Sequence, residues 1–173
     1  MIRRQAGEPT SSANERLGSS AHHRRWVLAF CLWVAFVWGH SLVQGPQSSL
    51  ESSRVVALVA PLLNALGISG EAAMSFAVRK TAHFLEYTVL GALSVPALLL
   101  PAREGRYPRW LGPLVVVLVP MADETIQRFV PGRESSPRDV LIDLCGVTCG
   151  TLIALLVSRY AAKRRGGGAA VRR

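Results

Sequence analysis

The stretch Trp26–Val43, WVLAFCLWVAFVWGHSLV, decides the fold of this chain. It is continuously apolar and contains no Asp, Glu, Lys or Arg. About 18 such residues are enough for a helix to cross the hydrocarbon core of a bilayer. The rival interpretation is a cleaved signal peptide, since Arg24 and Arg25 in front of the run resemble a twin-arginine leader. No small-x-small cleavage site follows, so we expect a retained transmembrane helix.

The composition of the whole chain agrees with a membrane protein. Of its 173 residues, 50% are hydrophobic and 18% are charged, whereas soluble domains carry about a quarter charged residues. The length allows one domain. The formal net charge is +9, but the basic residues flank apolar runs and form no aromatic-basic surface motif, which argues against nucleic-acid binding. The positive charge is better explained by contact with a membrane surface.

Further apolar runs repeat the pattern along the chain, at residues 79–100, 110–126 and 140–160. A shorter run at 54–68 contains Pro61 and is too short to span a bilayer comfortably. We therefore predict an all-α, polytopic membrane protein with four transmembrane helices plus a short interfacial or re-entrant helix. The predicted domain organisation is a disordered basic tail at 1–25, a transmembrane domain at 26–160 and a second disordered basic tail at 161–173.

The arginines orient these predicted spans. They are concentrated in the two tails and in the connection at 101–109, which lie on one side of the membrane if there are four spans. Cytoplasmic connections carry an excess of Lys and Arg. We therefore predict a multi-pass protein of the cytoplasmic membrane with both termini in the cytoplasm.

Polar residues interrupt three of the runs, all near the outer surface in this topology. On a helix that turns about 100° per residue, each set falls on one face. Ionisable groups inside a bilayer are costly and are tolerated when they face one another or water. We therefore predict one polar site, formed by Lys80, His83, Glu86 and Tyr87, by Asp123, Glu124 and Gln127, and by Asp139 and Asp143, with Arg133 from the loop between the last two runs.

A purely structural interpretation of the same residues stays open. Lys80 or Arg133 could pair with Asp123 or Asp143 and only hold the helices together. The segment Ser136–Asp139 is typical of a helix start, so Asp139 could be a capping residue. Gly146 and Gly150 form a small-xxx-small pair on the face of Asp143, which predicts close packing of another helix rather than phosphate binding.

Three motifs in these segments resemble the VanZ-like family over about residues 41–160. They are K-x-x-H-x-x-x-Y at Lys80–Tyr87, D-E-x-x-Q-x-F-x-P-G-R at Asp123–Arg133, and D-x-x-x-N/D-x-x-G at Asp139–Gly146. Family members usually have Asn where this chain has Asp143. The resemblance implies a small polytopic protein of the bacterial envelope, and the namesake of the family is associated with low-level resistance to teicoplanin-type glycopeptides.

Our first functional hypothesis is binding of an amphipathic anionic ligand, lipid-linked or related to peptidoglycan, at the outer leaflet. Lys80 and Arg133 would bind its phosphate or carboxylate, and the acids would orient these cations. His83, Tyr87 and Gln127 would complete the hydrogen bonds. The expected partners are this ligand and membrane lipids, with a link to glycopeptide resistance.

The second hypothesis is a membrane enzyme that acts on a lipid-linked envelope substrate by acid/base chemistry. Its candidate catalytic residues are His83 with Glu86, or Asp123 with Glu124, as the acid and base, and Lys80 would be a nucleophile after losing its proton. The same four candidates could hold a metal ion, but no established metal motif supports this, so we predict no metal and no cofactor. A third hypothesis is transport, although no inverted repeat supports it. Whether the protein is an enzyme stays open.

Overall fold

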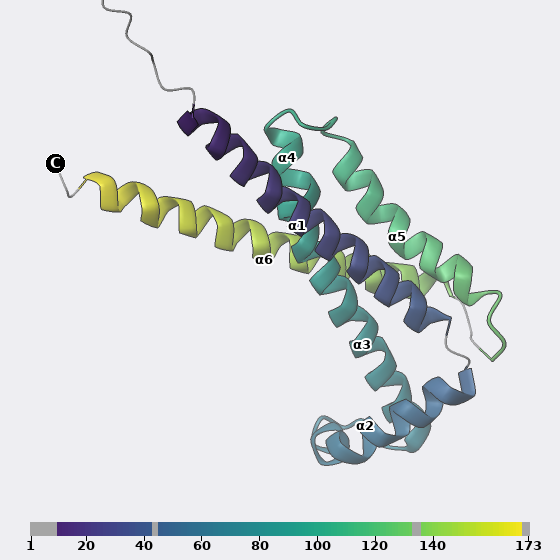
Figure 1. Cartoon of the computed structure of the whole chain (residues 1–173). Coiled ribbons are helices and arrows are strands. Elements are labelled where there is room, and N and C mark those ends of the chain that lie inside the picture. The colour runs from purple at the N-terminus through teal and green to yellow at the C-terminus, as the bar shows by residue number, and fades with distance from the viewer. Residues whose placement is uncertain (1–9, 43–44, 133–135, 171–173) are drawn as a thin grey trace, which may run out of the picture.

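The chain is helical throughout the part described by the computed structural model, which covers residues 10–42, 45–132 and 136–170. No strand occurs in these ranges, so the predicted all-α fold class is confirmed. Figure 1 shows a layered bundle in which α1 and α5 lie over the crossing of α3 and α6, with α2 across one end. The helices are α1 (Thr10–Ser41), α2 (Gly45–Ala65), α3 (Glu71–Ser94), η1 (Val95–Leu99), α4 (Leu100–Arg103), α5 (Leu111–Gln127) and α6 (Pro137–Ala170).

Helices α3, η1 and α4 form one continuous rod with a π-helical turn in the middle. Pro96 causes this turn, because proline has no backbone N–H to donate to the carbonyl four residues earlier. The Leu100 N–H instead bonds to the carbonyl of Val95, five residues back. The rod ends where Gly105 takes a positive φ of 82°.

The closest helix packing is between α3 and α6. A Cβ atom added to Gly150 would collide with the backbone carbonyl of Thr88, and one added to Gly146 would collide with that of Phe84. Across the same contact, Thr151 Oγ1 donates to the carbonyl of Gly91 at 3.3 Å. The predicted close packing at Gly146 and Gly150 is therefore confirmed, and it fixes the register of the two helices, which run parallel at this contact.

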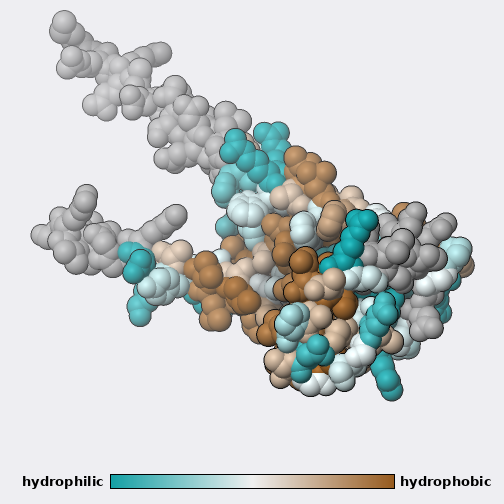
Figure 2. All heavy atoms as spheres, turned by 90° about the horizontal axis from the view of Figure 1, so that it is seen from below, coloured by the Kyte–Doolittle hydropathy of each residue, from teal (hydrophilic) through white to brown (hydrophobic). Residues whose placement is uncertain are grey.

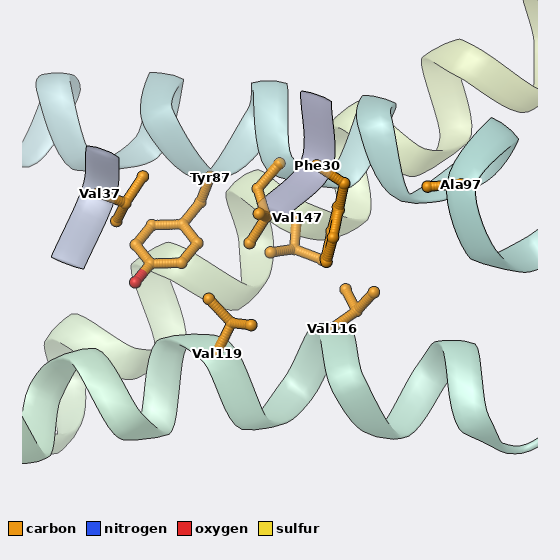
Figure 3. Packing of buried hydrophobic residues seen from close by; sticks show 8 residues of the cluster. Phe30, Val37, Tyr87, Ala97, Val116, Val119 and Val147 are labelled. Carbon is orange, nitrogen blue, oxygen red and sulfur yellow. The ribbon is translucent and has the colours of Figure 1, made fainter. Parts of the chain in front are cut away.

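The core is a cluster of apolar side chains between these two helices, α1 and α5. Figure 3 shows the Tyr87 ring of α3 within this cluster. Because α3 meets α1, α5 and α6 here, the cluster fixes the relative rotation of the four helices that carry the polar residues. Its buried members are Phe30, Val37, Tyr87, Leu90, Ala97, Val116, Val119 and Val147.

Two helical segments of the described chain are long and apolar enough to cross a membrane, Glu71–Arg103 and Pro137–Arg164. Only 22% of the apolar window of the second segment is buried, so most of its apolar surface faces outward. Figure 2 shows hydrophobic residues over much of the surface seen from below, including the arm of α6. The structure therefore confirms two candidate spans. The other two predicted spans, at 26–43 and 110–126, stay predictions. Helix α5, which contains most of the second of them, has only 17 residues.

The helices extend beyond the predicted spans. Helix α1 begins at Thr10, within the segment predicted as a disordered tail at 1–25, and α6 continues to Ala170, within the predicted tail at 161–173. Helix α2 begins at Gly45, ahead of the predicted interfacial run at 54–68. Adding a residue to an existing helix is far easier than nucleating one, so polar flanks without proline can continue a helix that the apolar run has started.

Candidate functional site

The register of α3 against α6 creates two stacked pairs of polar side chains. His83 Nδ1 lies 3.7 Å from Asp143 Oδ1. One helical turn away, Lys80 Nζ forms an ion pair with Asp139 Oδ1. Residues three or four apart share a helix face, so the parallel contact brings Lys80 to Asp139 and His83 to Asp143 in the same order along both helices. The predicted faces of these helices therefore do meet.

Helix α5 contributes Asp123, whose side chain is fully buried. The amide nitrogen of Gln127, one turn further along the same helix, donates to Asp123 Oδ2 at 3.0 Å. The same nitrogen lies 3.3 Å from Ser41 Oγ at the end of α1. Gln127 thus links two helices and fixes the orientation of the Asp123 carboxylate.

Three of these residues converge on one point: His83, Asp123 and Asp143 each offer an atom, and all three atoms lie within 4.8 Å of one another. Asp143 is 1% exposed. Within the described residues, Asp123 Oδ1 and both carboxylate oxygens of Asp143 have no hydrogen-bond partner. We call these three residues the acid–imidazole cluster.

Tyr87 follows His83 by one turn on the same face of α3. Its side chain is fully buried, and its hydroxyl has no hydrogen-bond partner among the described residues. In Figure 3 the ring points from α3 toward α5, with the hydroxyl directed away from Phe30. A buried phenol usually finds a partner, and the carboxylate of Asp123 lies close to this hydroxyl.

The remaining predicted acids have other partners. Glu86 Oε1 lies 3.0 Å from His40 Nδ1 of α1, and Glu124 Oε1 accepts a hydrogen bond from the backbone N–H of Ser136. Of the two predicted acid/base pairs, the His83–Glu86 pair is therefore replaced by His83 with Asp143. The reason is that α1 and α6 approach α3 from different sides, so that Glu86 faces α1 and His83 faces α6. The sequence of α3 alone does not tell which neighbouring helix each of its side chains will face.

The pairing of Lys80 also differs from the structural alternative considered above. Lys80 pairs with Asp139 rather than with Asp123 or Asp143. Asp139 is thus an ion-pair partner, while the backbone N–H of Arg138 is bonded by Ser136 Oγ at 3.3 Å, in the manner of a helix cap. Arg133, the second predicted cation, lies outside the described residues.

Sequence reasoning missed the contribution of α1. His40 and Ser41 reach Glu86 and Gln127, and Trp33 Nε1 donates to the backbone carbonyl of Glu86 at 2.9 Å. The sequence did contain an indication that α1 contributes to the site, because the end of the run at 26–43 lies at the same predicted membrane level as the other polar residues.

Beside the cluster, an open groove of about 360 Å³ runs between the end of α5 and the start of α6. Apolar side chains form most of its walls, and Glu124 and Arg128 add charge to it. An apolar wall with a few charged groups suits an amphipathic molecule better than a fully polar one. The lining residues are Met121, Glu124, Thr125, Arg128, Pro137, Val140 and Leu144.

The donor set that the structure gathers also differs from the metal alternative considered from the sequence. That alternative combined His83 and Asp123 with Glu86 and Glu124. In the described chain the group that converges is His83, Asp123 and Asp143. One imidazole and two carboxylates can hold a proton or a metal ion between them.

Comparison with known proteins adds one match. A family model described as VanZ/LLP1 matches residues 26–158, which covers all the residues of the site described above. Comparisons with curated proteins and with solved structures gave no match. Together with the two apolar candidate spans, this match indicates a membrane protein.

Proposed function

Because the chain belongs to the VanZ/LLP1 family, we propose that it is a bacterial envelope protein whose outward-facing polar site binds a lipid-linked or peptidoglycan-related anionic ligand. One observation carries this proposal: polar residues from three separate helices meet, and two of these helices form an apolar groove whose lining includes Glu124 and Leu144, the chain neighbours of Asp123 and Asp143. Helix docking alone needs far fewer buried polar groups. A ligand with a charged head and an apolar tail would use both features.

Lys80 is the cation best placed to bind the head group. Its side chain is 24% exposed, and its ion pair with Asp139 holds the ammonium near the start of α6. A phosphate or carboxylate at this position would gain a charge-assisted hydrogen bond without moving the helices. Arg133 lies in the sequence between α5 and α6, the two helices that line the groove, and we assign it to the same anion.

The proposed orientation places this site outside and both tails in the cytoplasm. The contact between His23 Nε2 and Tyr107 OH, at 2.8 Å, supports it. This contact joins the start of the apolar run of α1 to the connection after α4, so two arginine-rich segments lie at one end of the bundle. Lys80 lies toward the other end of α3. A basic cytoplasmic end and an outer polar site agree with the positive-inside rule.

The proposal is tested with undecaprenyl phosphate as the probe, and with undecaprenol as the uncharged control, added to the full-length protein in nanodiscs. We expect saturable binding of the phosphate alone, measured by native mass spectrometry. Lys80→Ala should weaken binding by about tenfold, which is about 1.4 kcal/mol, whereas Lys80→Arg should retain most of it. Arg79→Ala, which removes an exposed neighbouring cation, is the matched control. Equal binding of phosphate and alcohol would refute the proposal.

The proposed link to glycopeptide resistance has its own readout. Expression of the protein in a susceptible host should raise the teicoplanin concentration that inhibits growth. Lys80→Ala at a matched membrane level should remove this increase. An increase that persists in the Lys80→Ala strain would separate resistance from the polar site.

The 3.7 Å approach of His83 to Asp143 favours one alternative, an enzyme that acts on a lipid-linked substrate. An imidazole next to a buried carboxylate is a typical general base. In a hydrolytic version, His83 would take a proton from water, and the oxygen would attack phosphorus as the phosphoanhydride bond breaks. Release of phosphate from undecaprenyl diphosphate that is lost in His83→Ala would establish this alternative, while Lys80→Arg would test whether Lys80 must lose its proton.

A further inference from the structure

Among the described residues, the acid–imidazole cluster combines two buried carboxylates with one imidazole. Asp123 and Asp143 are both fully buried and close to each other. Buried carboxylates normally pair with a cation or coordinate a metal. In the described chain, Lys80 is engaged by Asp139 and His40 by Glu86, and His83 is the basic side chain next to Asp143.

Three carboxylate oxygens of the cluster have no hydrogen-bond partner within the described residues. Asp123 uses Oδ2 to accept from Gln127, and Oδ1 has no hydrogen-bond partner within the described ranges. Both oxygens of Asp143 are likewise without one. Since one oxygen of each carboxylate lies within 4.8 Å of a His83 nitrogen, the bundle presents acceptors around a shared centre. Hydrogen bonds among the described residues leave several of these acceptors unsatisfied.

We propose that His83, Asp123 and Asp143 bind a divalent transition-metal ion, Zn²⁺ or Mn²⁺. The imidazole nitrogen favours these ions over Mg²⁺ and Ca²⁺, which prefer oxygen ligands throughout. At metal–ligand distances of about 2.0–2.2 Å, neighbouring ligand atoms are about 3–3.5 Å apart. The present spacing requires each side chain to move inward by less than about an ångström.

Residues around the cluster complete the site. Gln127 orients Asp123 from behind, as the outer partners of metal ligands commonly do. Three protein ligands leave coordination positions for water or for a ligand oxygen. The buried Tyr87 hydroxyl, one turn from His83, could donate to a molecule in such a position. The ion would also add positive charge near Lys80. The proposed metal binding does not depend on the proposed function.

The test measures metal directly on the full-length protein in detergent, after removal of bound metal with a chelator. After the stripped protein is incubated with Zn²⁺ or Mn²⁺ and dialysed, we expect one equivalent of the ion by mass spectrometry, and a rise in melting temperature on addition of that ion. Mg²⁺ at the same concentration should have no such effect. Absence of stoichiometric metal in the wild-type protein would overturn the proposal, whatever the variants do.

Two variants locate the ion. Asp143→Asn keeps the shape of the side chain and removes an unbalanced charge, so the protein should still fold, and we expect its metal affinity to fall by about 100-fold. His83→Ala should lose affinity similarly. Asp139→Asn, one turn earlier on α6 and paired with Lys80, is the matched control and should bind metal as the wild type does. Unchanged affinity in Asp143→Asn would refute the assignment of the ligands.

The same variants distinguish other ways of balancing the charge. If the two carboxylates share a proton, Asp143→Asn will raise the melting temperature and wild-type protein will not respond to metal. If Arg133 supplies the charge, Arg133→Gln will lower the melting temperature, again without a metal response in the wild type. Either result overturns the metal site.

Discussion

The contact between α3 and α6 can be tested with Gly150→Ala. The added Cβ would lie 2.7 Å from the Thr88 carbonyl carbon and 3.0 Å from the Ala92 nitrogen, whereas carbon atoms in good contact are about 3.5–4.0 Å apart. The obstructing atoms are backbone, so no side-chain rotation can relieve the overlap, and the helices must separate by about 1 Å. Overpacking costs about 1–3 kcal/mol, and we expect a loss at the upper end of this range.

The assay is thermal unfolding of the purified protein in detergent, followed by tryptophan fluorescence. A loss of about 3 kcal/mol corresponds to a fall in melting temperature of about 6–12 °C for a chain of this size. The control is Gly39→Ala in α1, where nothing lies within 4 Å of the added atom, and alanine should there stabilise the helix by about 0.5–1 kcal/mol. If the two variants unfold within about 2 °C of each other, the close contact that brings His83 to Asp143 is refuted.

Two further predictions address orientation and the support of the cluster. In a cysteine-free background, a cysteine at Glu134 should react with an impermeant thiol reagent in intact cells and one at Glu104 should not; the opposite pattern would reverse the proposed orientation. Gln127→Leu should remove the hydrogen bond to Asp123 and lower the free energy of unfolding by about 1.5–3 kcal/mol. Thr125→Ala, an exposed change on the same helix, should alter it by less than about 0.5 kcal/mol, and equal effects would argue against a buried role for Gln127.

The fold could be predicted from sequence because apolar runs of membrane length leave few alternatives. The run at 110–126 matches α5 almost residue for residue. The ends of other helices were harder to predict, since the apolar pattern stops before the helix does. Helix α3 begins at Glu71, where the sequence is polar and exposed, and no cap or proline marks that start more clearly than the neighbouring residues do.

The sequence predicted which polar residues share a helix face, but it did not predict which residues of neighbouring helices pair with each other. The helical spacing of Lys80 and His83 placed them on one face, and they do meet α6 together. Which acid each one meets depends on the axial register of two helices. That register is set by backbone contact at Gly146 and Gly150, and a sequence pattern indicates such contact without giving its height along the partner helix.

The site has two charged layers, Lys80 with Asp139 and Asp123 with Asp143, and they should respond differently to a bound anion. The difference explains what the buried carboxylate of Asp143 requires. The outer layer, Lys80 with Asp139, is neutral as a pair and partly exposed, so it can meet an anion at little electrostatic cost. The inner layer holds two buried carboxylates and would repel the same anion. Asparagine, the residue usual in the family that the chain resembles, would remove one of these charges. Retaining Asp143 beneath an anion site is therefore favourable only if a cation or a proton accompanies it.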